Sequence, residues 1–124
     1  MCNSEILLIE DDFILNCDTR EALEEIGYCV QSVYCAEAAF EALNRHRYLG
    51  ALVTDIDLGP GPDGFDVAER ARVAYPHLAV VFVSGTAAGS HAARGVPRSE
   101  FLAKPFRPHQ LAAALARVIR LEAA

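Results

Sequence analysis

The chain has 124 residues, of which 52% are hydrophobic and 23% are charged, so it fits a single globular domain over residues 1–124 and excludes a disordered chain. The longest uninterrupted apolar runs have six residues, which is too short to cross a membrane. The net charge is −6, and the 6 basic residues after position 85 are scattered, which argues against direct nucleic-acid binding.

Short apolar runs recur along the chain and predict five strands, at residues 6–9, 29–34, 51–53, 79–83 and 101–103. These runs are too continuous for strands with one face in solvent, so we expect a sheet that is buried on both faces.

Helical spacing of apolar residues separates most of these runs and predicts helices within residues 15–26, 36–43, 65–71 and 111–118. Gly27 stands where a left-handed cap would end the first helix. Residues 86–100 contain Gly89, Gly95 and Pro97 and show no apolar stripe, so we expect a reduced or absent fourth helix.

Alternating strands and helices predict a doubly wound α/β fold with right-handed crossovers. We expect a five-stranded parallel sheet in the flavodoxin-like order 2-1-3-4-5, with helices on both faces. Ligand sites in such sheets lie at the carboxyl ends of the strands, where the winding direction reverses, which here is between the first and third strands.

Polar side chains gather at that predicted edge. Glu10-Asp11-Asp12 follow the first strand, and Asp55-Ile56-Asp57 follow the third. The fourth strand runs into Ser84-Gly85-Thr86 and the fifth into Lys104-Pro105. The sequence therefore predicts carboxylates, a hydroxyl and an ammonium around one cleft.

Carboxylates about 4 Å apart repel each other by roughly 4 kcal/mol at an effective dielectric constant near 20, so a cation should lie among them. Ligands that are all oxygens favour Mg²⁺, or Mn²⁺, which commonly bridges a carboxylate and a phosphate. Lys104 is the only lysine among 11 basic residues, and a compact ammonium suits a phosphate in a tight site. The pattern indicates phosphoryl transfer.

With these residues in place, the chain resembles the receiver domain of two-component response regulators over essentially its whole length. Residues 6–12 resemble the family's first-strand acid motif, and Val53-Thr54-Asp55 resembles its phosphoacceptor strand. Lys104-Pro105-Phe106 matches its Lys-Pro-Phe motif, in which the Lys-Pro bond is usually cis.

The resemblance implies a role for each of these residues. Asp55 would be the phosphoacceptor, and Glu10, Asp11, Asp55 and the backbone carbonyl of Asp57 would bind the metal. Lys104 would neutralise charge on the phosphoryl group. Ser84 would contact the phosphoryl group, and Phe101 would be the aromatic switch residue.

The resemblance also implies an activity and partners. The donor would be a phosphohistidine in a sensor histidine kinase or a histidine phosphotransfer protein. The chain would promote its own phosphorylation and dephosphorylation without being an enzyme in the usual sense, and it would need no cofactor besides the metal. Signalling would pass to an unknown downstream protein, a homodimer being one possible form, without nucleic acid or membrane.

Two departures from the family pattern lie after the phosphoacceptor. Residues 58–64 form a longer loop, richer in Gly and Pro, than the family usually has after its acceptor. Asp57 and Thr86 lie at positions expected to modulate the rate at which water attacks the acyl phosphate, although Asp57 could instead be a solvated loop acid. Asp12 either joins the metal site or orients a water molecule.

Three other functional classes fit parts of this pattern. The Asp55-Ile56-Asp57 pattern also resembles the nucleophile motif of haloacid dehalogenase-type phosphatases, but there the motif comes first and the other acids come late. A degenerate receiver that acts only as a binding module conflicts with the complete residue set. A flavodoxin-like cofactor binder lacks a phosphate-cradling loop after the first strand.

Redox state and location are inferred from residue usage. The four cysteines form no C-x-x-C pair and are not spaced with the four histidines like a zinc site, so we expect them to be reduced. The first residues lack the basic and then apolar pattern of a secretory signal, so we expect a cytoplasmic protein.

Overall fold

The computed structural model describes residues 5–45, 48–85 and 94–123. Strands and helices alternate through most of this part of the chain. In chain order they are β1 (Glu5–Ile9), α1 (Phe13–Ile26), β2 (Cys29–Val33), α2 (Ala36–Arg45), β3 (Ala51–Asp55), α3 (Gly64–Ala74), β4 (Ala79–Ser84), β5 (Ser99–Ala103) and α5 (Pro108–Ala123).

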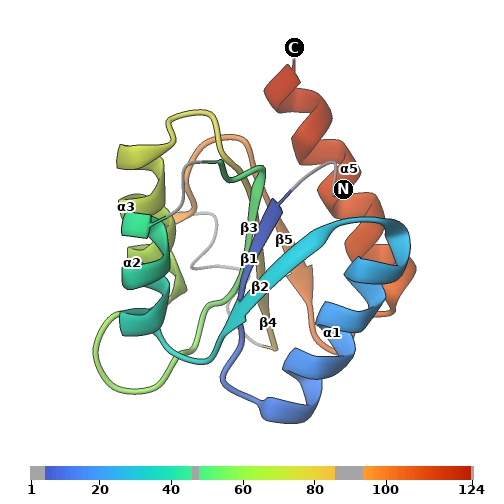
Figure 1. Ribbon diagram of the computed structural model, residues 1–124, viewed down its shortest axis with the longest axis horizontal. Coiled ribbons are helices and arrows are strands. Elements are labelled where there is room, and N and C mark those ends of the chain that lie inside the picture. Colours follow the sequence, from blue (N-terminus) through green and yellow to red (C-terminus); the bar gives the residue numbers. More distant parts are fainter. Residues whose placement is uncertain (1–4, 46–47, 86–93, 124) are drawn as a thin grey trace.

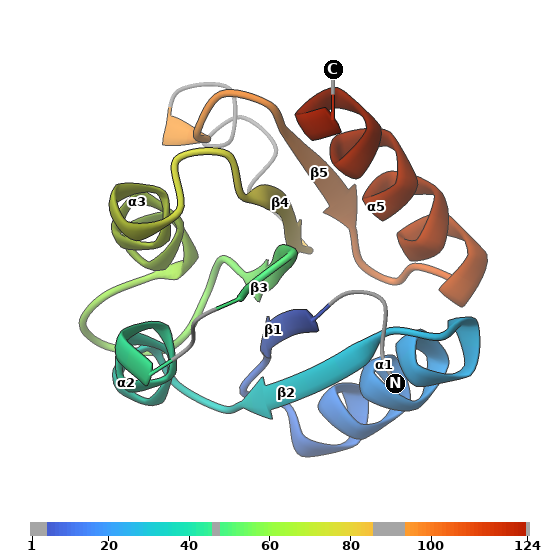
Figure 2. The ribbon, with the colours of Figure 1, turned by 45° about the horizontal axis from the view of Figure 1, so that its top comes forward.

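All five strands are parallel and lie in the order β2-β1-β3-β4-β5, which confirms the predicted topology. Helices α1 and α5 cover one face of the sheet, and α2 and α3 cover the other (Figures 1 and 2). The winding direction reverses between β1 and β3, so the carboxyl ends of these two strands border the predicted cleft.

Alternating side chains of the central strands form two apolar cores, one on each face of the sheet. Leu7, Leu52 and Phe82 pack toward α2 and α3, where Phe65 meets Phe82 with ring centroids 4.9 Å apart. Ile6, Val53 and Val81 pack with residues of α1 and α5. Every residue of β3 and β4 is buried, as the continuous apolar runs predicted.

The helix ends near the cleft are capped by side chains. Asp12 is the N-cap of α1, and its carboxylate accepts the Leu15 backbone N–H. Asp63 caps α3 in a capping box with Asp66. Gly27 ends α1 in the left-handed conformation, with φ of 117°, as predicted.

The structure leaves the expected reduction of the fourth helix untested and corrects the expectation for one cysteine. Residues 86–93, which include most of the segment predicted to have a reduced fourth helix, lie outside the described residues. Cys17 and Cys35 are free, but Cys29 is disulfide-bonded, so the expectation that all four cysteines are reduced is wrong for Cys29. Within the described ranges, no helix has the length and apolar character needed to cross a bilayer.

Candidate functional site

The carboxyl ends of four strands bring the predicted site residues to one edge of the sheet. Glu10 directly follows β1, Asp55 ends β3, Ser84 ends β4 and Lys104 directly follows β5. Backbone pairing extends to this edge, where the Lys104 N–H donates to the Ser84 carbonyl at 2.9 Å. The Lys104-Pro105 peptide bond is cis, as the resemblance implied.

Lys104 joins two of the carboxylates. Its Nζ lies 2.8 Å from Oε1 of Glu10 and 3.1 Å from Oδ2 of Asp55. Both carboxylate side chains are almost completely buried, whereas 23% of the lysine side chain is exposed. The ammonium therefore reaches into the cleft from its solvent side and compensates two buried negative charges.

Glu10, Asp11 and Asp55 form a carboxylate cluster in which one oxygen of each lies within 4.8 Å of the others. Asp11 is exposed and the other two are buried. All the donor atoms are oxygens, and the exposed member leaves room for metal-bound water. These are the features that Mg²⁺ prefers, so the cluster fits the metal that the sequence predicted.

Burial raises the pKa of both buried acids. Burial is the main cause that raises the pKa of Glu10 from 4.5 to about 7, and the nearby Asp55 adds to it against hydrogen bonds from Lys104 and Asp12. Burial also raises the pKa of Asp55, although Lys104 opposes the change. Burial alone would lower the pKa of Lys104, but its contacts with the two acids outweigh this and raise it.

The second carboxylate oxygen of Asp55 is hydrogen-bonded to the loop that follows β3. Oδ1 of Asp55 accepts the Asp57 backbone N–H at 3.3 Å. The Asp57 side chain is exposed. Further along this glycine-rich loop, Gly59 and Gly61 have φ of 89° and 96°, a conformation that favours glycine. The loop then enters α3 at Gly64, where an added Cβ would overlap the Asp55 carbonyl oxygen.

The predicted switch residues lie on one face of the sheet. Ser84 is buried at the end of β4, and Phe101 on β5 is partly buried against the core on the α2 and α3 side. Ser84 follows Phe82 by two residues, so its side chain points to this same face. Phe82 and Phe101 are direct partners in the β4–β5 register. Thr86 lies outside the described residues.

Some residues that shape the cleft were not predicted. The side-chain amide of Asn16 donates to the backbone carbonyls of Glu10 and Val33, at 3.0 and 3.1 Å. Asp12 caps α1, and its backbone N–H donates to Oε2 of Glu10 at 3.1 Å. Asp12 is not part of the carboxylate cluster. An Asp just before a helical apolar stripe predicts an N-cap, so the role of Asp12 could have been found in the sequence. Nothing in the sequence around Asn16 indicates its hydrogen bonds to the two strand ends.

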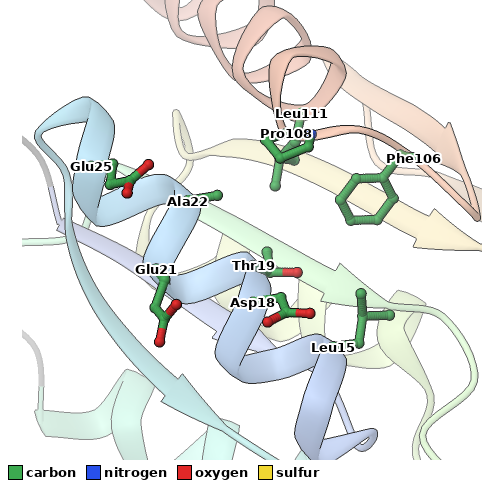
Figure 3. Close-up of a pocket in the computed structure, with 9 residues that line it drawn as sticks. All are labelled: Leu15, Asp18, Thr19, Glu21, Ala22, Glu25, Phe106, Pro108 and Leu111. Carbon is green, nitrogen blue, oxygen red and sulfur yellow. The ribbon is translucent and has the colours of Figure 1, made fainter.

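A separate hollow of about 420 Å³ lies between α1 and α5 (Figure 3). Leu15, Ala22, Phe106 and Leu111 supply apolar lining, and Asp18, Glu21 and Glu25 line it from α1. None of the residues of the carboxylate cluster lines this hollow. It is therefore a feature of the neighbouring surface and not part of the acidic cleft.

The fold and the site define a doubly wound α/β domain with an acidic, lysine-bridged cleft at the carboxyl edge of its sheet. The family model of the response regulator receiver domain matches residues 6–116. The chain belongs to this family. Receiver domains are signalling modules that interact with histidine kinases or phosphotransfer proteins and with downstream proteins, and they bind Mg²⁺ at an acidic site.

Curated relatives of different lengths match the chain. The response regulator receiver protein CpdR of Brucella abortus is 35% identical over 108 residues, covering 86% of this chain and 88% of CpdR. The response regulator protein FleR of Pseudomonas aeruginosa is 32% identical over 120 residues, covering 92% of this chain. The chain spans only 24% of FleR and 49% of the regulator RprY of Bacteroides fragilis, so it corresponds to one part of those proteins.

Solved structures show the same fold. A response regulator receiver protein from Sinorhizobium medicae is 36% identical, with a TM-score of 0.92 and 96% of each chain covered. The receiver domain of the sensor histidine kinase PA1611 from Pseudomonas aeruginosa is 27% identical, with a TM-score of 0.80 over 94% of this chain and 98% of that one. In that structure a magnesium ion is coordinated in the active-site cleft.

Proposed function

We propose that this receiver accepts a phosphoryl group on Asp55 from a phosphohistidine of a sensor histidine kinase or histidine phosphotransfer protein, in a Mg²⁺-dependent reaction. The observation that carries the proposal is the placement of the Asp55 carboxylate. One oxygen contacts the Lys104 ammonium, the other accepts the Asp57 N–H, and the group lies in a cluster with Glu10 and Asp11.

The chemistry is an exchange of a P–N bond for a P–O bond. A carboxylate oxygen of Asp55 attacks phosphorus, and the bond from phosphorus to the donor imidazole breaks. The imidazole leaves with the electron pair and is neutral when its other nitrogen holds the proton. The product on this chain is an acyl phosphate.

Lys104 contributes charge and position to this step. Its ammonium already contacts Oδ2 of Asp55, so it can move to a phosphoryl oxygen with little displacement. Glu10, Asp11, Asp55 and the backbone carbonyl of Asp57 would hold Mg²⁺, or Mn²⁺. The bound ion would supply neutralisation of charge on the phosphoryl oxygens.

Phosphorylation is proposed to switch protein contacts through Ser84 and Phe101. An acyl phosphate on Asp55 adds roughly two negative charges that a hydroxyl and an ammonium can engage. Movement of Ser84 toward the phosphate would open space for the Phe101 ring on the same sheet face. A downstream protein, or a second copy of the chain, would then recognise the surface around β5 and α5. Unchanged NMR signals of the Phe101 ring after phosphorylation would contradict this switch.

The primary test is incubation with acetyl phosphate and Mg²⁺, followed by intact mass measurement. We expect one phosphoryl adduct that hydroxylamine removes, formed on the wild type and not on the Asp55→Asn variant. The adduct should also need the metal, so EDTA should prevent it. Absence of an adduct would favour a degenerate receiver that acts only as a binding module. Turnover of a small phosphomonoester would favour a haloacid dehalogenase-type phosphatase.

A further inference from the structure

A buried amide side chain contacts the carboxyl end of β1. Asn16 is fully buried and lies on the face of α1 that also buries Thr19 and Leu23. Core-facing positions of this kind usually carry apolar side chains. Oδ1 of Asn16 is buried and has no hydrogen-bond partner in the part of the chain that the structure describes. A buried polar atom without a partner is destabilising, so packing alone does not explain an amide at this position.

The hydrogen bonds of the amide nitrogen do explain it. Nδ2 of Asn16 donates to the backbone carbonyls of Glu10 and Val33, at 3.0 and 3.1 Å. A carbonyl only accepts hydrogen bonds, so both partners require the nitrogen, and not the oxygen, of the amide at this place. The side chain therefore ties α1 to the carboxyl ends of β1 and β2. An apolar side chain of the same size would fill the space without making this connection.

The Glu10 carbonyl is part of the peptide group that joins Glu10 to Asp11, and these are two of the three acids of the carboxylate cluster. A peptide group is planar, so a hydrogen bond that orients its carbonyl also orients the Cα atoms on both sides of it. Asn16 thereby affects the direction in which both acidic side chains leave the backbone. Its amide donates to backbone carbonyls and not to the carboxylates, so its effect on the cluster passes through the backbone.

Glu10 is also held through its side chain by the same turn of α1. The backbone N–H of Asn16 donates to the Asp12 carbonyl at 2.9 Å, and the Asp12 N–H donates to Oε2 of Glu10 at 3.1 Å. Residues 10–16 therefore hold Glu10 at two points, its carbonyl and one carboxylate oxygen. The position of this acid depends on how α1 is fixed to the strand ends, and Asn16 provides that fixation.

The consequence of such fixation differs between divalent ions. Mg²⁺ requires a nearly ideal octahedron of oxygens at about 2.0–2.1 Å, whereas Ca²⁺ accepts irregular arrangements at about 2.3–2.6 Å. A small displacement of two carboxylates therefore costs more affinity for Mg²⁺ than for Ca²⁺. Residues that orient metal ligands without touching the metal commonly affect its affinity in this way.

We propose that Asn16 is a positioning residue that orients Glu10 and Asp11 for Mg²⁺ and so makes the cleft prefer Mg²⁺ to Ca²⁺. This inference rests on the proposed function, because it needs the carboxylate cluster to be the metal site of phosphoryl transfer. Asn16 itself binds neither the metal nor the phosphoryl group.

The test measures the affinity of the metal-free protein for MgCl₂ and for CaCl₂ by isothermal titration calorimetry at one pH. Asn16→Leu keeps the size of the side chain and removes its hydrogen bonds. Asn16→Ala gives the same comparison without a branched apolar group, and the variant that folds, as judged by circular dichroism, is used. Thr19→Val is the matched control, because Thr19 is 6% exposed on the same face of α1 but lines the hollow toward α5.

We expect the Mg²⁺ dissociation constant of the Asn16 variant to rise about tenfold, the lower end of the range for residues that orient metal ligands. The Ca²⁺ dissociation constant should change by no more than about twofold, because Ca²⁺ tolerates displaced ligands. Thr19→Val should keep the wild-type ratio of the two constants. A general loss of structure would instead weaken the binding of both ions together.

Phosphorylation by acetyl phosphate supplies a second measurement. The Mg²⁺ concentration that gives half the maximal rate should rise about tenfold in the Asn16 variant, in parallel with the dissociation constant. At saturating Mg²⁺ the rate should return to within about threefold of the wild type, because Asn16 contributes through metal binding and not through contact with the reacting atoms.

The outcomes separate this inference from the proposed function. A wild type that binds no Mg²⁺ overturns the proposed Mg²⁺-dependent reaction. A wild type that binds Mg²⁺, together with an Asn16 variant of unchanged Mg²⁺ affinity, overturns the positioning role alone. Equal weakening of Mg²⁺ and Ca²⁺ binding also overturns it, as does a loss of selectivity in Thr19→Val. A loss of rate that saturating Mg²⁺ does not restore overturns it too, because it would place the effect of Asn16 on the acceptor.

Discussion

The ammonium of Lys104 lies 2.8 Å from Oε1 of Glu10, although the two residues are far apart in sequence and follow strands separated by β3 and β4. The contact places a fixed positive charge inside the set of oxygens that would bind a divalent ion. A divalent ion bound there would share these carboxylates with the lysine, so the position of one would affect the binding of the other.

Replacing the lysine should change metal affinity. In Lys104→Met the carboxylate cluster loses an adjacent positive charge that repels the ion, so Mg²⁺ should bind roughly tenfold more tightly, which corresponds to about 1.4 kcal/mol. Phosphorylation by acetyl phosphate should be largely lost. Isothermal titration calorimetry measures the affinity. Arg117→Met, which removes a surface partner of Glu100, is the control and should bind Mg²⁺ as the wild type does.

Metal binding should depend on pH through Glu10. The pKa of this carboxyl is raised from 4.5 to about 7, and the metal binds only the ionised form, so affinity should rise about fivefold from pH 6 to 7 and level off above 8. Folding holds this proton more tightly than the unfolded chain does. The metal-free protein should therefore lose this stabilising contribution as pH rises from 4.5 through 7.

The control for this pH dependence is Glu10→Gln, which cannot ionise at position 10. Its weaker Mg²⁺ affinity should be almost independent of pH over the same range. A wild-type affinity that stays constant between pH 6 and 8 would contradict the raised pKa.

Much of this architecture followed from local patterns. Continuous apolar runs predicted five buried strands; the five strands are present, but the edge strands β2 and β5 are only partly buried, because each lacks a neighbour on one side. The order of Glu10, Asp55 and Lys104 along the chain predicted their meeting at one edge, because parallel strands end together. The resemblance then supplied the family. What could not be predicted depends on tertiary placement: the Asn16 amide between two strand ends, and the Phe13–Tyr34 stack, join residues with no common periodicity.

The close packing of Gly64 against the Asp55 backbone also depends on tertiary placement, and substitution of Gly64 tests it. An added methyl group at this first residue of α3 would overlap the carbonyl oxygen of Asp55 and approach the Ile56 Cα at 2.9 Å. Gly64→Ala should therefore lower the free energy of unfolding by about 1–3 kcal/mol and slow phosphorylation by displacing the acceptor. Gly85→Ala meets no atom within 4 Å and should have stability close to that of the wild type. Chemical denaturation measures both.

Asp57→Asn tests whether the exposed acid after the acceptor controls the lifetime of the acyl phosphate. The Asp57 backbone N–H contacts Asp55 Oδ1 at 3.3 Å, so its side chain leaves the chain close to where water must attack phosphorus. The substitution keeps the shape and the backbone contact and removes one negative charge. Because the side chain is exposed, we expect stability within about 0.5 kcal/mol of the wild type. The first-order rate of phosphoryl loss, followed by intact mass after the donor is removed, should change severalfold. Asp18→Asn, an equal change of charge on α1, should leave that rate unaltered, and equal rates in Asp57→Asn and wild type would assign Asp57 to a solvated loop.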